Sequence, residues 1–150
     1  CMALGNETTD YVSAILAIEP ETVRDWAEKR RVPFTTFIDL SQREEVGRLV
    51  LNDILKLNSS LPEHARVKKY VLLHKEFDPD EAELTRTRKL RRTFVEKKYS
   101  DIIQGIYEGK ESIPVTTTFT YKDGRTAVVS ANIKVRDVEK EAREAGLVKE

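Results

Sequence analysis

The hydrophobic pattern of this chain changes period near Gly109, and that change constrains the fold more than any other feature. Before Gly109, apolar residues recur every three or four positions in two long stretches, as in amphipathic helices. After Gly109 they alternate with polar residues on both sides of Asp123-Gly124, as in two strands joined by a tight turn whose two central residues have positive φ. The sequence therefore predicts an α+β fold in which short strands and two long amphipathic helices precede a C-terminal β-hairpin and a final helix.

Local signals predict the other elements. Short apolar runs indicate strands over residues 1–5 and 11–18 and a central strand over residues 70–73. Pro20 indicates a helix start, and Ser41 with Glu44 forms a capping-box pattern before the first long helix. Residues 32–40 are expected to form a connector, and residues 137–146 a polar helix. The expected inward positions are Val46, Leu49, Val50, Ile54 and Leu57 in the first long helix, Phe94, Val95, Tyr99, Ile102, Ile103 and Ile106 in the second (about residues 90–107), and Val115, Thr117, Phe119, Tyr121, Val129, Ala131, Ile133 and Val135 in the hairpin.

The charges balance over the whole chain, so any functional charge must be local. Lysine and arginine number 26, as do aspartate and glutamate, and together they make up 35% of the chain. No overall field therefore draws the protein to nucleic acid or anionic lipid. With Cys1 alone and no ligand spacing around His64 or His74, neither a disulfide nor a metal site is expected. No apolar run is long enough to cross a bilayer, and we expect a soluble domain in a reducing cytoplasm.

A local cationic cluster runs from Arg86 to Lys98, where seven basic side chains occur with one glutamate. It follows an acidic loop and precedes a helix, so residues 85–89 are expected to be extended or turning. Three interpretations are open: a solvated helix start, a phosphate-binding segment in which threonine hydroxyls accompany the cations, or a nucleic-acid site. The third is weakened because no aromatic residues alternate with the cations. In the first interpretation the partner carboxylates would be Asp78, Asp80, Glu81 and Glu83.

Several segments, taken in order, resemble the C-terminal domain of the AMP-forming acyl-CoA synthetases, specifically the long-chain fatty acid branch of the adenylate-forming superfamily. They are "CMALGNETTDYVSAILAI", then "LPEHARVKKYVLLHKEFDPDEAELTRTRKLRR" and the helix that follows, so the resemblance covers residues 1 to about 108. The most specific part is the order itself: a strand ending at Gly5, its paired strand, the approach to a further strand, and "ELT" followed by threonine, lysine, an aliphatic residue and arginines.

The resemblance implies a role for Lys89. In many members the equivalent lysine follows a small residue and glycine, precedes an aliphatic residue and arginine, and enters the active site from the small domain during adenylation. Here Lys89 follows Thr87-Arg88. Its implied role is to hold the substrate carboxylate and the phosphate oxygens of ATP while negative charge develops at the α-phosphorus. The accompanying candidates for binding ATP or CoA are Thr85, Thr87, Arg88, Arg91 and Arg92.

The chain also departs from the family pattern. Long-chain members often have proline and an aliphatic residue where this chain has Arg86 and Arg88, so the loop is more cationic here. The Gly/Ser/Thr-rich phosphate loop and the hinge before the small domain do not appear in the sequence, and the chain opens directly on a strand. We therefore interpret it as an enzyme fragment, inactive alone, with residues 1–109 as a lid domain truncated at its start and residues 110–150 as an extension packed on the same domain.

The expected function is that of the C-terminal domain of an ATP-dependent long-chain fatty acid CoA ligase, which supplies Lys89 for acyl-adenylate formation and closes over the active site for thioester formation. The parent would use ATP, Mg²⁺ and CoA, with no cofactor bound to the fragment. Its expected partner is the N-terminal adenylation domain of the same polypeptide, and no specific nucleic acid is expected to bind. The parent enzyme is expected in the cytoplasm, where it can associate peripherally with a membrane. Two alternatives stay open: a parent that uses a carrier-protein thiol or another acid, and an autonomous anion- or RNA-binding module that uses residues 86–92.

Overall fold

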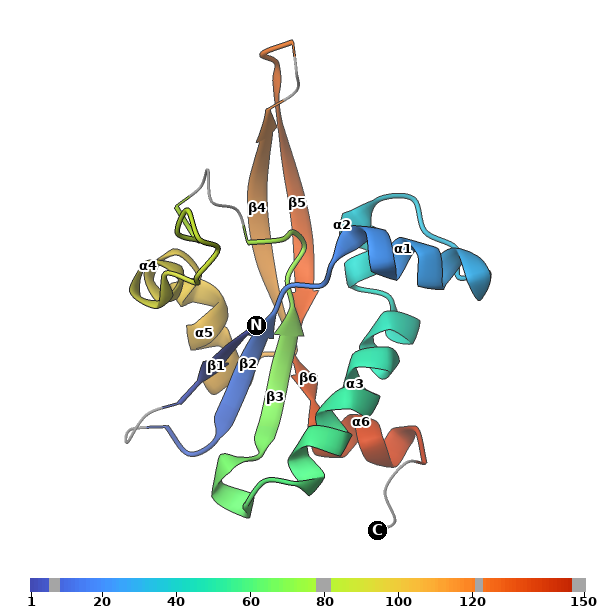
Figure 1. Ribbon diagram of the computed structural model, residues 1–150, viewed down its shortest axis with the longest axis vertical. Helices are drawn as coiled ribbons and strands as arrows, with labels where there is room; N and C mark the ends of the chain where they lie inside the picture. Colours follow the sequence, from blue (N-terminus) through green and yellow to red (C-terminus); the bar gives the residue numbers. More distant parts are fainter. Residues whose placement is uncertain (6–8, 78–81, 121–122, 147–150) are drawn as a thin grey trace.

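A four-stranded sheet forms the middle of the structure, a computed structural model that describes residues 1–5, 9–77, 82–120 and 123–146 (Figure 1). Its strands are β1 (Met2–Leu4), β2 (Val12–Leu16), β3 (Val67–Leu72) and β6 (Arg136–Asp137), in the order β1-β2-β3-β6. β1 is antiparallel to β2, β2 is parallel to β3, and β3 is antiparallel to β6. The three strands predicted from apolar runs are confirmed, whereas β6, which completes the sheet beside β3, was not predicted.

Helices cover both faces of the sheet, and each face has its own core. Tyr70 and Leu72 of β3 pack in one core with residues from four helices: α1 (Pro20–Lys29), α2 (Phe37–Ser41), α3 (Glu44–Ser59) and α6 (Val138–Glu144). Val71 and Leu73 pack in the other core with α4 (Arg92–Lys98) and α5 (Ser100–Tyr107). Because successive side chains along a strand point to opposite faces of the sheet, β3 contributes side chains to both cores. Burial on both faces accounts for the uninterrupted apolar run of residues 70–73.

The first long helix differs from its expected form at its start. α3 begins at Glu44 with no side-chain cap from its N-cap residue, Arg43. Ser41 instead ends α2, where its hydroxyl donates to the Ile38 carbonyl oxygen. The predicted capping box is therefore wrong, whereas the predicted connector over residues 32–40 does join α1 to α3 and contains most of α2. Leu57 is 51% exposed, while Leu51, which was not among the expected inward positions, is buried.

The second long helix is two helices, because the backbone breaks at Tyr99 (φ −103°, ψ 24°). Val95, Tyr99, Ile102 and Ile106 are buried as predicted, but Phe94 is exposed. The predicted end is confirmed, since α5 ends at Tyr107 and Gly109 follows with a φ of +79°. The helices predicted at Pro20 and at residues 137–146 are confirmed as α1 and α6, and a short 3₁₀ helix, Glu63–Ala65, leads into β3.

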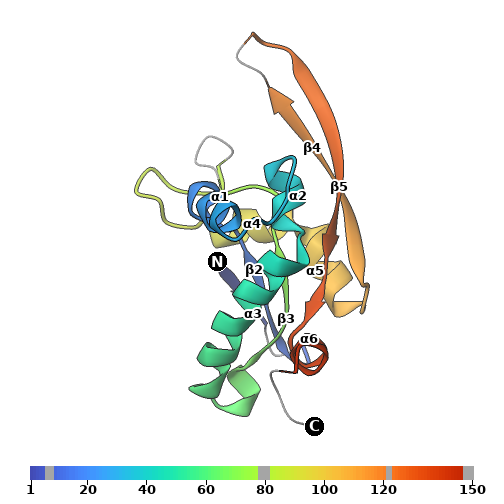
Figure 2. The same ribbon diagram turned by 90° about the vertical axis from the view of Figure 1, so that its right-hand side faces the viewer.

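A long antiparallel hairpin, β4 (Ser112–Thr120) and β5 (Thr126–Lys134), extends well beyond the helices (Figures 1 and 2). The predicted hairpin is confirmed, but the predicted tight turn centred on Asp123-Gly124 is wrong. Thr120 pairs with Thr126, so the connection is longer than two residues, and among its described residues only Gly124 has positive φ, +86°. Among the described members of the predicted apolar face, only Ile133 is fully buried, beside Ile113, which was not predicted. Val115, Val129, Ala131 and Val135 are half-buried. The Thr117 and Phe119 side chains and residue Tyr121 lie outside the described part.

Arg136, which follows the hairpin, is a buried charge that joins the C-terminal residues to α3. Its side chain is 2% exposed, and its Nη1 atom lies 3.2 Å from Glu44 Oε2 and 3.3 Å from Glu141 Oε1. Burial raises the pKa of the Glu141 carboxyl, whereas the hydrogen bond from Lys134 and the charge of Arg136 lower the pKa of Glu44. The guanidinium lies against Gly47, where an added Cβ would be 2.2 Å from Nη1. A glycine near the start of α3 therefore makes room for this charge.

We expect Gly47→Ala to destabilise the protein by about 1–3 kcal/mol, although alanine is the better helix former, because its methyl group would displace the guanidinium from its carboxylate partners. In an Arg136→Ala background the same substitution should be neutral or stabilising. Urea denaturation of the wild type, both single variants and the double variant gives the coupling energy. Equal destabilisation in both backgrounds would show that something other than Arg136 requires the glycine.

Candidate active-site loop

The cationic segment forms a tight hairpin at residues 84–90, between β3 and α4. Leu84 and Leu90 form an antiparallel bridge, and the Thr85 N–H donates to the Lys89 carbonyl oxygen at 2.8 Å. The Arg88 N–H closes the turn by donating to the Thr85 carbonyl oxygen at 2.9 Å. This pattern is that of a three-residue hairpin loop whose last residue is left-handed, and Arg88 has a φ of +61°. The prediction that residues 85–89 are extended or turning is confirmed.

Arg88 adopts a left-handed backbone conformation, with a φ of +61°, which glycine favours. Glycine adopts positive φ without steric cost, whereas a residue with a Cβ atom does so at a cost of about 1–2 kcal/mol. The loop therefore accepts the strain of an arginine at this position, which places a positive charge directly before Lys89.

The two threonine hydroxyls stabilise the turn from within. Thr85 Oγ1 accepts a hydrogen bond from the Lys89 N–H at 3.0 Å and lies 3.1 Å from Thr87 Oγ1. Since one hydroxyl hydrogen serves the contact between the two threonines, the other is available to a bound oxygen atom. Thr85, Thr87 and Lys89 thus lie together as the sequence interpretation required.

The predicted cations divide into two groups. Lys89, Arg86 and Arg88 are exposed, and none of them forms an ion pair with a residue that the structure describes. Arg91 and Arg92 are occupied within the domain. Arg91 Nη1 donates to the Ala82 carbonyl oxygen at 3.2 Å, and Arg92 donates to the Ala3 carbonyl oxygen at 2.7 Å and pairs with Glu96 at 3.1 Å. Five candidate binding residues were predicted beside Lys89, but only Thr85, Thr87 and Arg88 share its loop.

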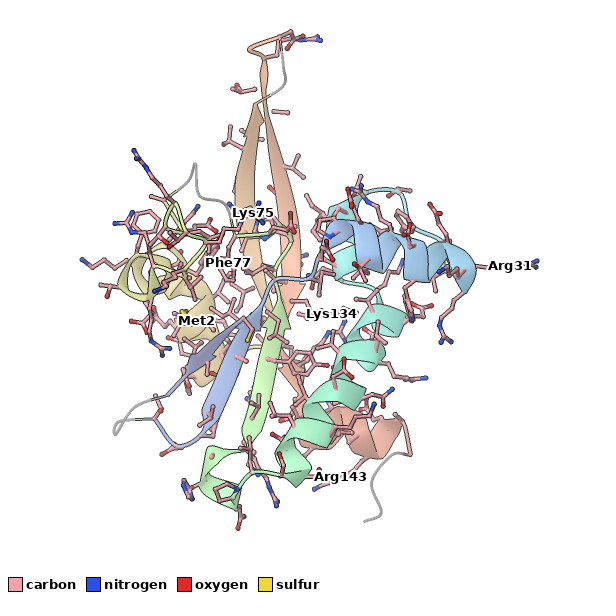
Figure 3. All side chains as sticks on the ribbon, in the orientation of Figure 1. Met2, Arg31, Lys75, Phe77, Lys134 and Arg143 are labelled. Atoms are coloured by element: carbon pink, nitrogen blue, oxygen red, sulfur yellow. The ribbon has the colours of Figure 1, made fainter. Side chains whose placement is uncertain are left out.

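Glu83, which immediately precedes the hairpin, is a completely buried carboxylate. Its Oε1 atom accepts hydrogen bonds from Lys98 Nζ at 2.5 Å, from Lys75 Nζ at 2.9 Å and from the Tyr99 hydroxyl at 2.9 Å. Lys75 follows β3, and Lys98 and Tyr99 lie at the break between α4 and α5. Figure 3 labels Lys75 and Phe77 on the segment that leads from β3 toward α4. Three side chains from two other parts of the chain therefore converge on one carboxylate beside the hairpin.

This ionic cluster is the part of the site that the sequence did not predict. In the interpretation as a solvated helix start, Glu83 was expected to pair with the cationic cluster. It does pair with Lys98, the last residue of that cluster, but also with Lys75, which lies before it. The other predicted carboxylates, Asp78, Asp80 and Glu81, lie outside the described residues. The lysines stand 8 and 15 positions from Glu83, so no helical or strand spacing indicates the contacts. The one local signal was the "ELT" triplet, which places Glu83 directly before the bridged Leu84.

Neither a metal centre nor a membrane span adds to this site. Within the described ranges, no three or more His, Cys, Asp or Glu side chains come together in a way that could hold a metal ion. In the same ranges, no helix has the length and apolar character needed to cross a membrane.

The fold and the lysine-bearing loop agree with a comparison against known families. The family model described as the AMP-binding enzyme C-terminal domain matches residues 32–111, more than half of the 150-residue chain. The match contains α2, α3, β3, the loop at residues 84–90, α4 and α5. The chain belongs to this family and is the C-terminal domain of an adenylate-forming enzyme. No curated protein and no solved structure matched the chain. The domain boundary at residue 109 stays a prediction.

Arg88→Gly should give a more stable protein than Arg88→Ala, by about 1 kcal/mol, because only glycine relieves the strain of a positive φ. The two variants are matched, since both lose the guanidinium and they differ in the Cβ atom alone. Chemical denaturation of both measures the difference. If the alanine variant were as stable as the glycine variant, the left-handed backbone at residue 88 would carry no strain.

Proposed function

We propose that this chain is the C-terminal domain of an AMP-forming long-chain fatty acid CoA ligase and that Lys89 acts in acyl-adenylate formation. The class of enzyme follows from the family match. The observation that supports the role of the lysine is its setting: Lys89 is exposed, has no ionic partner among the described residues, and follows two threonine hydroxyls on a hairpin with a defined backbone. Such a group can meet an anionic substrate that another domain presents.

In the proposed first half-reaction, a carboxylate oxygen of the fatty acid attacks the α-phosphorus of ATP and pyrophosphate leaves. The product is an acyl-AMP anhydride. The Lys89 ammonium would contact the carboxylate and phosphate oxygens as negative charge shifts between them, which stabilises the transition state most strongly in a closed site from which water is excluded. Mg²⁺, when bound to ATP, offsets further phosphate charge.

In the proposed second half-reaction, the CoA thiol attacks the acyl carbonyl carbon and AMP leaves. We propose that the domain closes over the active site differently in this step, so that Lys89 is no longer needed there. Thr85, Thr87 and Arg88 are proposed to bind phosphate oxygens of ATP or CoA, because their donors lie on the same exposed loop. Arg91 and Arg92 are secondary candidates, since their guanidinium groups already have partners.

The partner that this proposal requires is the N-terminal adenylation domain of the same polypeptide. That domain would hold the acyl pocket and the nucleotide, and we propose a cytoplasmic enzyme that associates peripherally with a membrane at most. Assays of the parent with a panel of acids, and with CoA against a carrier protein as acceptor, test the long-chain and CoA parts of the proposal.

Replacing the lysine tests its role directly. In the parent enzyme, Lys89→Ala should slow acyl-AMP formation by about 100-fold or more, because one contact to the developing charge is lost. Thioester formation from supplied acyl-AMP should change only slightly. Lys97→Ala, which removes an exposed lysine of α4, is the matched control and should leave both half-reactions intact. Equal losses in both half-reactions of Lys89→Ala would contradict the assigned role.

The 150-residue chain alone should fold but not catalyse. Two buried cores support a cooperative thermal transition, which calorimetry measures. One lysine does not hold ATP in line with an acid, so ATP and Mg²⁺ with a long-chain acid should release no pyrophosphate above background. Robust pyrophosphate release by the purified chain would mean that it carries a complete active site.

A further inference from the structure

The hairpin that carries Lys89 has few apolar contacts with the rest of the domain. Residues 86–89 are exposed, and Leu84 and Leu90 at its base are only half-buried, with Leu90 packed at the margin of one core. The backbone closes just outside these leucines, where the Arg91 N–H donates to the Glu83 carbonyl oxygen at 2.9 Å. The orientation of the hairpin therefore depends on how residue 83 is held.

Glu83 is held by charge and by hydrogen bonds. Its side chain is 0% exposed, and the side chains of Lys75 and Lys98 beside it are 16% and 30% exposed. A carboxylate buried to this extent is costly unless it is paired and hydrogen-bonded, and all three described donors meet the same oxygen atom, Oε1. Displacing Glu83 would therefore break several strong contacts at once.

The break between α4 and α5 allows two adjacent side chains to contact the Glu83 carboxylate. Adjacent residues of a continuous helix point about 100° apart, because there are 3.6 residues per turn. Lys98 and Tyr99 are adjacent, yet both donate to Glu83 Oε1, and the backbone leaves the helical conformation at Tyr99. The interrupted helix lets both side chains reach one point.

We infer that Glu83 is a positioning residue: its buried carboxylate, held by Lys75, Lys98 and Tyr99, fixes the hairpin that carries Lys89. The backbone hydrogen bonds that close the hairpin begin at Glu83, so releasing its side chain loosens the hairpin and displaces Lys89. A misplacement of about 1 Å can cost about 100-fold in rate. The catalytic consequence rests on the proposed function, whereas the structural part does not.

The structural part is tested in the 150-residue chain by amide hydrogen exchange. Three hairpin amides, those of Thr85, Arg88 and Lys89, donate hydrogen bonds that report on its integrity. In Tyr99→Phe and Glu83→Gln these amides should exchange about tenfold faster relative to the amide of Val71 in β3, because the hairpin opens locally. Tyr99→Phe removes a single hydroxyl group, and this variant alone provides the test if Glu83→Gln does not fold.

Tyr107→Phe is the matched control. It removes the same group from the other end of α5, where the hydroxyl accepts from Ser13 and lies 3.2 Å from the Leu4 carbonyl oxygen, far from the hairpin in sequence and contacts. It should leave the relative exchange of the hairpin amides unchanged. If Tyr99→Phe behaved like Tyr107→Phe, Glu83 would be a core group without a positioning role, and the inference would be overturned.

The catalytic part is tested in the parent enzyme. Tyr99→Phe should lower kcat for acyl-AMP formation about tenfold with little change in KM for ATP, and should leave thioester formation from supplied acyl-AMP intact. A merely structural defect would instead affect both half-reactions alike. A faster-exchanging hairpin with normal adenylation, in an enzyme that Lys89→Ala does slow, would overturn the inference. If Lys89→Ala has no effect, the proposed function fails, and the exchange experiment alone decides whether Glu83 positions the hairpin.

Discussion

The parallel pairing of β2 with β3, buried on both faces, is the constraint on which the rest of the structure depends. Parallel neighbours require a crossover connection, which here contains α1, α2 and α3 and covers one face of the sheet. The other face must be covered by a later part of the chain, and α4 and α5 do so. The loop at residues 84–90 lies on the way from β3 to α4, so its place at one end of the sheet follows from the need to cover the second face.

The residues beyond the family match complete this sheet. Without β6, β3 would be an edge strand with unpaired backbone groups. The Gln42 side chain connects the end of β3 to the end of β5. Its Nε2 donates to the Leu72 carbonyl oxygen at 2.8 Å, and its Oε1 accepts from the Lys134 N–H at 3.0 Å. Arg136 then reaches Glu44 at the start of α3. The polar contacts of residues 134–136 thus substitute for a longer strand.

Elements that bury a regular face could be predicted from the sequence, and elements defined by contacts between distant residues could not. The spacing of apolar residues within one stretch of sequence is enough to predict β3, the helices α1, α3 and α6, and the hairpin β4–β5. The two residues of β6 are too short for a pattern, and the break at Tyr99 interrupts a stretch whose apolar spacing continues through it. In the site, resemblance indicated Lys89 and its loop, whereas the Glu83 cluster depends on a fold that brings Lys75 and Lys98 together.

Two features of the loop cost stability, and both lie within a few residues of Lys89. Arg88 adopts a strained φ, and Glu83 is a buried charge. We infer that the contacts of Glu83 hold the backbone beneath the lysine in one conformation. Ordering a flexible residue costs about 1–2 kcal/mol, so a disordered loop of this length would consume much of the binding free energy of a substrate. A backbone that is ordered before the substrate arrives leaves only the lysine side chain to be immobilised. An exposed cation on a strained hairpin beside a buried carboxylate therefore suits the proposed role of Lys89, in which a single ammonium is presented to a site on another domain.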